Sequence, residues 1–266
     1  MTGTDTGPIA LTIADGVAEI LLNRPDRRNA MDLALQEGLV AAIETVRGSD
    51  ARALVVGGVG KHFCVGADLD VVDGEDRAGG DDTTTRMLAA CEAFLLALRT
   101  LPMPVVAAVE GAAAGGGAGL ALAADLRVLG RSATLHGSTF PLGMTPDAGV
   151  SWYLARALGP ARATNLMIRN APMTAELLAS VGLADAIVDD GTALAEAHRL
   201  AAELGPRTPP LAIVGLRELM AAASTSDLAG QLDRERQWVG TLNRTADFAE
   251  GVSAFLQRRT PEFTGR

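Results

Sequence analysis

The stretch VVAAVEGAAAGGGAGLALAADLRV, residues 105–128, decides the fold of this chain of 266 residues. Its first five residues form an apolar run typical of a buried strand, and the residues after its glycines are typical of a helix. Three consecutive glycines, at positions 115–117, cost conformational entropy and are favoured where backbone must approach a ligand or another element closely. From this stretch alone, ligand approach and tight packing remain equally open.

Outward from this strand–turn–helix unit, strands and helices alternate towards the N-terminus. Apolar patterns predict strands at residues 9–13, 17–22 and 53–56 and helices at residues 31–46 and 87–98. This alternation is typical of an α/β layer structure. From about residue 191 the pattern predicts only helices, at residues 193–204, 211–223, 228–241 and 246–258. We therefore expect a core of residues 1–190 and a helical C-terminal subdomain of residues 191–266.

Charge and composition exclude several classes of protein. A formal net charge of -9 and a pI of about 4.9 argue against a binder of nucleic acid or of anionic membranes. Two cysteines, Cys64 and Cys91, are too few for a disulfide framework and lack metal-ligand spacing. The N-terminal residues lack the apolar segment of a signal peptide, and the longest uncharged stretch, residues 111–124, is too short to span a bilayer. We expect a cytoplasmic protein without a metal.

A second glycine turn, GKHFCVGADLD at residues 60–70, suggests a function that the two turns could share. Neither turn fits a phosphate motif, because Leu120 replaces the third glycine of GxGxxG and His62 follows the Gly60-Lys61 pair. Two separated glycine turns can instead each present a backbone N–H group. Such a pair stabilises the enolate or tetrahedral oxyanion of a thioester.

Five blocks of this sequence, in order along nearly the whole chain, resemble the enoyl-CoA hydratase/isomerase, or crotonase, superfamily. They are LNRPDRRNAM (22–31), FCVGADL (63–69), PVVAAVEGAAAGGGAGLALAADLRV (104–128), PLGMTPDAG (141–149) and AFLQRRTPEF (254–263). The resemblance implies the crotonase (ClpP-like) fold, a spiral core of repeated ββα units with a helical C-terminal trimerisation subdomain. It also implies a homotrimer, or a hexamer made of two trimers.

The same resemblance implies an acyl-CoA substrate and assigns residues to it. The thioester oxygen would lie between the backbone N–H groups of Ala67 and Gly116. Coenzyme A, as part of the substrate and not as a separate cofactor, would lie along Ala67, Asp68, Leu69 and Asp70. The turn of residues 24–29 would border it, with Arg24, Arg27 or Arg28 available to its phosphates.

The carboxylates of this sequence depart from the hydratase pattern. The hydratases use two glutamates, and the corresponding positions are occupied by Gly119 and Thr139. Neither residue is a carboxylate base. Asp147 lies instead in the third block, where some double-bond isomerases of the family carry their catalytic aspartate. Moving a double bond needs a single acid/base group, so we expect an enoyl-CoA isomerase that uses Asp147.

Other interpretations of these residues stay open. Asp147 precedes a predicted helix and would also suit an N-cap or a turn. A hydratase or hydrolase could hold its water with Thr139, His136 or Asp147, and a paralogue without activity could still bind acyl-CoA. Gly119, His136, Thr139 and Trp152 are candidates for the acyl pocket, although core packing would also explain His136 and Trp152. The acidic, glycine-rich residues 74–85 are expected to form a mobile loop over the site.

Overall fold

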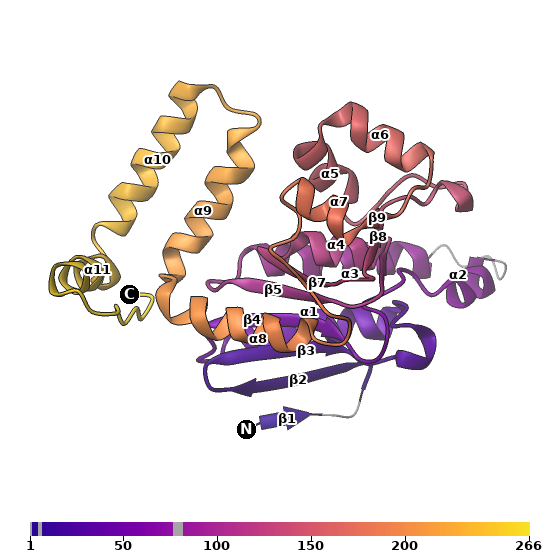
Figure 1. Cartoon of the computed structure of the whole chain (residues 1–266), viewed down its shortest axis with the longest axis horizontal. Helices are drawn as coiled ribbons and strands as arrows, with labels where there is room; N and C mark the ends of the chain where they lie inside the picture. Colours follow the sequence, from indigo (N-terminus) through magenta and orange to yellow (C-terminus); the bar gives the residue numbers. More distant parts are fainter. Residues whose placement is uncertain (1, 5–6, 77–81) are drawn as a thin grey trace.

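A seven-stranded sheet forms the centre of the molecule (Figure 1). The computed structural model describes residues 2–4, 7–76 and 82–266. In spatial order the strands are β1 (Thr2–Thr4), β2 (Ile9–Ala14), β3 (Val17–Leu22), β4 (Ala53–Gly58), β5 (Val105–Val109), β7 (Leu126–Gly130) and β10 (Ala186–Val188). The pairs β1–β2 and β2–β3 are antiparallel, and the pairs from β3 to β10 are parallel.

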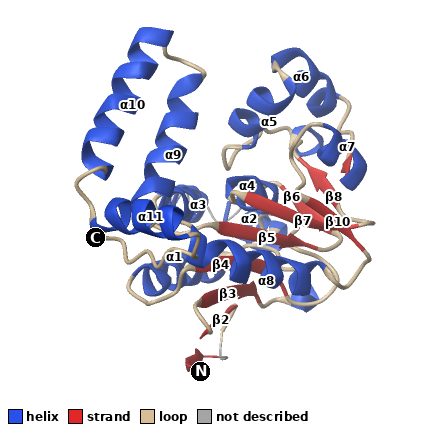
Figure 2. Cartoon of the chain, turned by 60° about the vertical axis from the view of Figure 1, so that its left-hand side comes forward, coloured by secondary structure: helices blue, strands red, loops and turns tan. Residues whose placement is uncertain are grey.

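Helices cover both faces of this sheet (Figure 2). On one face, α1 (Leu33–Arg47), α3 (Asp82–Arg99) and α4 (Gly116–Ala123) enclose the main hydrophobic core. On the other face, α8 (Ala193–Leu204) places Ala193, Ala197 and Ala201 in a smaller cluster with strand residues such as Val55 and Val106. Apolar side chains on both faces explain why the inner strands are continuous hydrophobic runs.

A second, three-stranded sheet lies beside the first. It contains β6 (Ala112–Ala114), β8 (Thr134–His136) and β9 (Met173–Thr174), with β8 central. The helical segments around it are η1 (Pro25–Arg27), α2 (Leu69–Asp76), η2 (Phe140–Leu142), α5 (Val150–Leu158), α6 (Pro160–Ile168) and α7 (Ala175–Ser180). Because β6 follows β5 directly, this sheet fixes the glycine turn that comes after β6.

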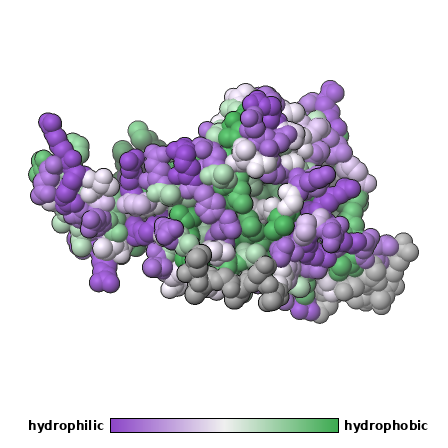
Figure 3. Space-filling view, turned by 60° about the horizontal axis from the view of Figure 1, so that its bottom comes forward, coloured by the Kyte–Doolittle hydropathy of each residue, from purple (hydrophilic) through white to green (hydrophobic). Residues whose placement is uncertain are grey.

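The C-terminal helices extend from the core as an arm. After η3 (Gly205–Arg207), this arm consists of α9 (Pro210–Ala223), α10 (Leu228–Leu242) and α11 (Ala246–Gln257). Figure 3 shows it projecting from the body, with hydrophobic and hydrophilic side chains mixed on its surface. The buried Arg217 of α9 joins the arm to the core, because its guanidinium binds the Asp125 carboxylate and the carbonyls of Leu101 and Met103.

The predicted strands and helices are all present, with small changes of boundary. The expected loop at residues 74–85 is wrong at both ends, since residues 74–76 belong to α2 and residues 82–85 to α3. Its centre, residues 77–81, lies outside the described residues. The sequence did not predict β1, β6, β7, β9 or β10, and α8 packs on the core sheet although it lies beyond residue 190.

Candidate active site

The two glycine turns lie against each other because the segments before them pair side by side. The Cys64 amide donates to the Ala112 carbonyl over 3.1 Å, and the Ala114 amide donates to the Cys64 carbonyl over 2.8 Å. The Gly115 amide then donates to the His136 carbonyl of β8 over 3.1 Å. Both turns are thus held at the junction of the two sheets.

Each turn bends at a glycine with positive φ. Gly66 has φ +90° and Gly115 has φ +49°, conformations that other residues rarely adopt. A methyl group added to Gly115 would lie 3.7 Å from the Gly66 Cα, which shows how closely the turns approach. The amides of the following residues, Ala67 and Gly116, donate no hydrogen bond that links these turns to other described residues. Gly116 begins α4, where backbone N–H groups have no partner within the helix.

Asn29 and Asp68 hold the arginine-rich turn beside this site. The buried Asn29 accepts from the Arg24 amide over 2.9 Å and donates to the carbonyls of Val59 and His62. The Asp68 carboxylate, also buried, receives the guanidinium groups of Arg24 at 3.0 Å and Arg27 at 2.8 Å. Burial alone would raise the pKa of Asp68, but hydrogen bonds from the two arginines lower it below its ordinary value.

The residues predicted to bind coenzyme A differ in whether their side chains already have partners within the protein. Arg24 also contacts Asp32 and the Ala30 carbonyl, and Arg27 also contacts Asp70. Arg28 is exposed and forms no ion pair within residues 7–76 and 82–266, so its guanidinium is the one available to a phosphate. Leu69 is half exposed at the start of α2.

Asp147 lies in the turn before α5, where its backbone carbonyl accepts from the Val150 amide over 3.0 Å. The N-cap of α5 is Gly149 and no side chain caps the helix, so Asp147 is a turn residue and not an N-cap. Its Oδ1 atom is buried and has no hydrogen-bond partner among the described residues. Burial raises the pKa of this carboxyl group. A half-buried carboxylate with a raised pKa and an unpaired oxygen is suited to accepting a proton.

Gly119 faces this turn from α4. A methyl group added to Gly119 would overlap the carbonyl oxygen and the Cβ of Ala148. Ala148 itself has φ +49°, which is uncommon for a residue other than glycine. With the turn in this position, a glutamate side chain cannot occupy position 119. Tight packing thus explains this glycine.

A groove of about 420 Å³ opens beside the Asp147 turn. One wall is the face of α3 that carries Leu88, Cys91, Glu92, Leu95, Leu96 and Arg99, and the other consists of Ala148, Gly149, Trp152 and Tyr153. Burial, with a smaller contribution from the nearby Asp147 charge, raises the pKa of the Cys91 thiol to about 12. Cys91 is thus a neutral apolar wall residue. Of the residues that the sequence suggests for an acyl pocket, Trp152 lines this groove. The sequence did not reveal the α3 wall, although the apolar residues of α3 recur at helical spacing.

Two further predicted pocket residues, His136 and Thr139, do not line this groove. His136 on β8 contacts the Thr134 hydroxyl at 3.2 Å, and burial lowers its pKa, which favours the neutral imidazole. Thr139 donates its hydroxyl to the Met144 carbonyl over 3.1 Å and so closes the loop that contains η2. Both side chains therefore have partners within the protein.

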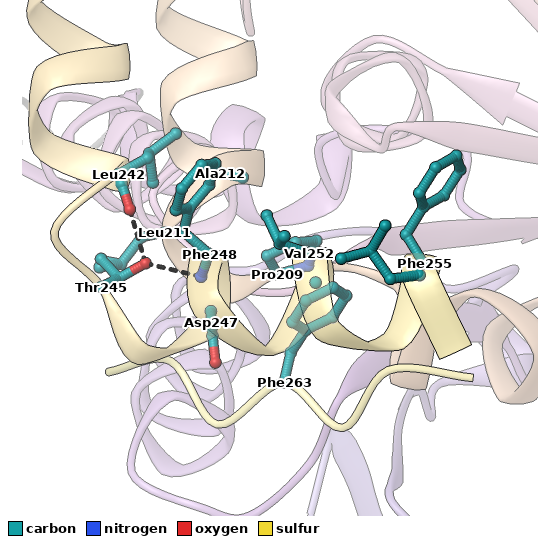
Figure 4. Close-up of a pocket in the computed structure, with 12 residues that line it drawn as sticks. Pro209, Leu211, Ala212, Leu242, Thr245, Asp247, Phe248, Val252, Phe255 and Phe263 are labelled. Atoms are coloured by element: carbon teal, nitrogen blue, oxygen red, sulfur yellow. Dashed lines mark hydrogen bonds between the residues drawn. The ribbon is translucent and has the colours of Figure 1, made fainter. Parts of the chain in front are cut away.

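A second hollow, of about 400 Å³, lies in the C-terminal arm (Figure 4). Its walls are mainly apolar and include Leu211, Phe248, Val252 and Phe263. It lies apart from Asp147 and both glycine turns, and no residue of the candidate active site lines it. Within the described parts of the chain, no cluster of His, Cys, Asp or Glu could hold a metal ion, and no helix is long and apolar enough to cross a membrane.

Comparisons with known proteins identify the family of this chain. Residues 12–266 match the family model described as enoyl-CoA hydratase/isomerase. A probable enoyl-CoA hydratase of Rhodobacter capsulatus is 40% identical over 97% of this chain and 98% of its own length. The 1,2-epoxyphenylacetyl-CoA isomerase of Escherichia coli is 35% identical over 96% of this chain and 97% of its own.

Solved structures of this family share the fold of the chain. The crystal structure of an enoyl-CoA hydratase from Polaromonas sp. JS666 has a TM-score of 0.90 and 33% identity, covering 96% of this chain and 99% of that one. The α/β architecture is therefore the crotonase fold, as the sequence predicts. With its fold and nearly its full length matched, the chain belongs to the enoyl-CoA hydratase/isomerase family.

Proposed function

We propose that this enzyme shifts the C=C bond of an enoyl-CoA thioester, with Asp147 as the single acid/base group. The observation that carries this proposal is the half-buried Asp147 carboxyl, which has a raised pKa and a buried oxygen without a partner among the described residues. The next two residues, Ala148 and Gly149, line an apolar groove, and the position of the first hydratase glutamate is closed by the contact between Gly119 and Ala148.

The reaction follows from proton transfer at two carbons. Asp147 removes a proton from C2 of a 3-enoyl thioester, and the electron pair moves into the thioester carbonyl to give a dienolate. The backbone N–H groups of Ala67 and Gly116 donate to the oxygen as its charge develops, which stabilises this intermediate. Protonated Asp147 then returns the proton at C4, and the double bond lies between C2 and C3.

The rest of the substrate follows from the surroundings of these groups. The acyl group would lie in the groove between α3 and α5, with Trp152 at its wall. Coenzyme A would pass Ala67, Asp68, Leu69 and Asp70, with a phosphate at Arg28. We propose no separate cofactor, since coenzyme A is part of the substrate.

Hydration is the second candidate because several relatives carry that name. They include the Rhodobacter protein and the 2,3-dehydroadipyl-CoA hydratase of Escherichia coli, which is 33% identical over 93% of this chain. In this chain a hydratase would have to activate water with Asp147 or His136, since Thr139 is a poor base.

Incubation of 2-enoyl- and 3-enoyl-CoA thioesters in heavy water separates these reactions. For the isomerase, mass spectrometry and proton NMR would show a moved double bond, deuterium at C2 or C4 and no added water.

The variant Asp147→Asn should lower kcat by about 10²–10⁴-fold while acyl-CoA binding persists. Gain of water would support the hydratase, and binding without turnover across the panel would support a paralogue without activity. Full turnover by the variant would refute the role of Asp147.

We also propose that the chain assembles as a homotrimer or as a hexamer of two trimers. Large apolar side chains are exposed along the arm, among them Met220, Leu228, Val239 and Phe255. Phe255 is 83% exposed and borders the apolar hollow of Figure 4. Several large exposed apolar side chains on one subdomain favour a protein interface there.

A further inference from the structure

The groove beside Asp147 changes character along its length. Its α3 wall is apolar at Leu88, Leu95 and Leu96, and it ends at the guanidinium of Arg99. Arg99 lies eight residues after Cys91, which corresponds to about 12 Å along the helix axis. Ala148, next to Asp147, lines the same groove. The groove therefore extends from the turn that carries the proposed acid/base group to a positive charge.

Arg99 has no carboxylate partner in the part of the chain that the structure describes. Its Nη2 donates to the backbone carbonyl of Arg217 over 3.3 Å, and its guanidinium carbon lies 5.5 Å from the centre of the Trp152 ring. The side chain is half-buried. By contrast, Arg24, Arg27, Arg127 and Arg217 each contact a carboxylate. A half-buried guanidinium without a counter-ion favours an anionic ligand.

We propose that Arg99 binds a carboxylate at the far end of the acyl group, so that the enzyme prefers thioesters of dicarboxylic acids. This inference rests on the proposed function, because it takes the groove as the acyl site. The apolar middle of the groove accommodates the methylene chain, and Arg99 supplies a charge-assisted hydrogen bond to its end.

Two other charged residues, Glu92 and Arg156, lie near the groove but do not take the place of Arg99 at its end. Glu92 also lines it, but it lies seven residues before Arg99, or about 10 Å along α3, towards the Asp147 end. Arg156 lies 3.7 Å from the centre of the Trp152 ring, yet it is exposed and does not line the groove. Arg156 is therefore a matched control for Arg99.

Affinity for two saturated thioesters tests the proposal without depending on turnover. Octanoyl-CoA and the mono-CoA thioester of octanedioic acid differ in the group at the chain end. Isothermal titration should show tighter binding of the diacid thioester by about 10- to 100-fold, the range for a hydrogen bond to a charged group. Arg99→Gln should bring this ratio close to one, Arg99→Lys should retain part of it, and Arg156→Gln should keep it.

Equal affinities in the unaltered protein would overturn the proposal, as would a preference that survives Arg99→Gln. A stronger preference for a phenyl-ended thioester would assign the groove end to stacking on Trp152 instead. If neither octanoyl-CoA nor the diacid thioester binds, the acyl-CoA site itself is wrong. If both bind without a diacid preference, only the role of Arg99 fails, so the two failures are distinguishable.

Discussion

At the scale of single residues, Asp68 and Asp147 show how surroundings set the chemistry of a carboxylate. Two arginines bind Asp68 and hold its pKa below the ordinary value despite burial. Asp147 has no such partner, and burial raises its pKa. Asp68 therefore stays ionised and holds the arginine-rich turn, while Asp147 can change its protonation state. Environments that separate two carboxylates in this way are typical of acid/base sites.

The raised pKa of Asp147 predicts a pH-dependent cost in stability. The native state binds this proton more tightly than the unfolded chain, so the free energy of unfolding falls as the pH rises from the unfolded towards the folded pKa. Above the folded pKa the cost is complete. Asp147→Asn should therefore raise the Tm at pH 7, and the gain should shrink as the pH falls towards 4. Calorimetry at both pH values measures this difference, and an equal gain at both would contradict it.

Gly119 should be intolerant of even a methyl group. In Gly119→Ala the added carbon overlaps the Ala148 carbonyl, so we expect a loss of about 1–3 kcal/mol in the free energy of unfolding and a lower kcat. Gly240→Ala in α10 is the control, because a methyl group there meets nothing within 4 Å and the helix should become more stable. Urea unfolding of both variants tests this, and equal stability would refute the steric argument.

At the scale of elements, α4 connects the candidate active site to the arm. The helix begins at Gly116, the proposed oxyanion donor, and Asp125 follows two residues after its end. Asp125 accepts from the Val105 amide over 2.8 Å and binds the Arg217 guanidinium of α9. One buried ion pair thus fixes the end of α4, the start of β5 and the arm together.

Removal of Arg217 should loosen this joint. Arg217→Met removes the guanidinium from Asp125 and from three backbone carbonyls, which should cost about 3–5 kcal/mol in the free energy of unfolding. Arg199→Met on α8 removes only exposed ion pairs and should leave the unfolding midpoint unchanged. Denaturation of the two variants with urea distinguishes a structural joint from a surface contact.

The sequence predicts helices and strands well where the spacing of apolar residues repeats several times, and poorly where the element is too short for a repeat. The helices of the arm have several turns, so their apolar spacing is visible. The strands β6 and β9, which the sequence did not predict, have three residues or fewer, and alanines alone form β6. Such short strands are specified by tertiary pairing, which one sequence does not display.

At the scale of the whole molecule, the arm leaves apolar side chains exposed that the single chain does not cover. Phe255, Leu256 and Leu228 are each at least 74% exposed. Their burial between copies of the chain would follow from the assembly that we propose. The sequence predicts the helices of this arm, and the exposure of these side chains becomes visible only in three dimensions.

Charge on this surface should dissociate the assembly. Phe255→Asp places a carboxylate in the proposed apolar interface, so we expect smaller particles in analytical ultracentrifugation with little change in helical content. Ile168→Asp, which changes an exposed residue of α6, should keep the original mass. An unaltered protein that sediments as a monomer would refute the assembly, whatever the variants do.

The sequence predicts only the part of the candidate site that lies in local motifs. The glycine turns and Asp147 stand in continuous motifs that the sequence displays. The groove combines residues 88–99 of α3 with residues 148–153 around the start of α5, and only the fold brings these segments together. The partners that occupy Arg24 and Thr139 are likewise products of tertiary contacts.

The contact between Gly119 and Ala148 also bears on how such enzymes diverge. A glutamate at position 119 and the present Asp147 turn exclude each other in space. A single substitution that restores the glutamate would displace the turn and lose the existing carboxylate before a second one could act. An evolutionary route between the two chemistries must therefore change the loop and the helix together, or pass through an intermediate that retains the fold without the activity.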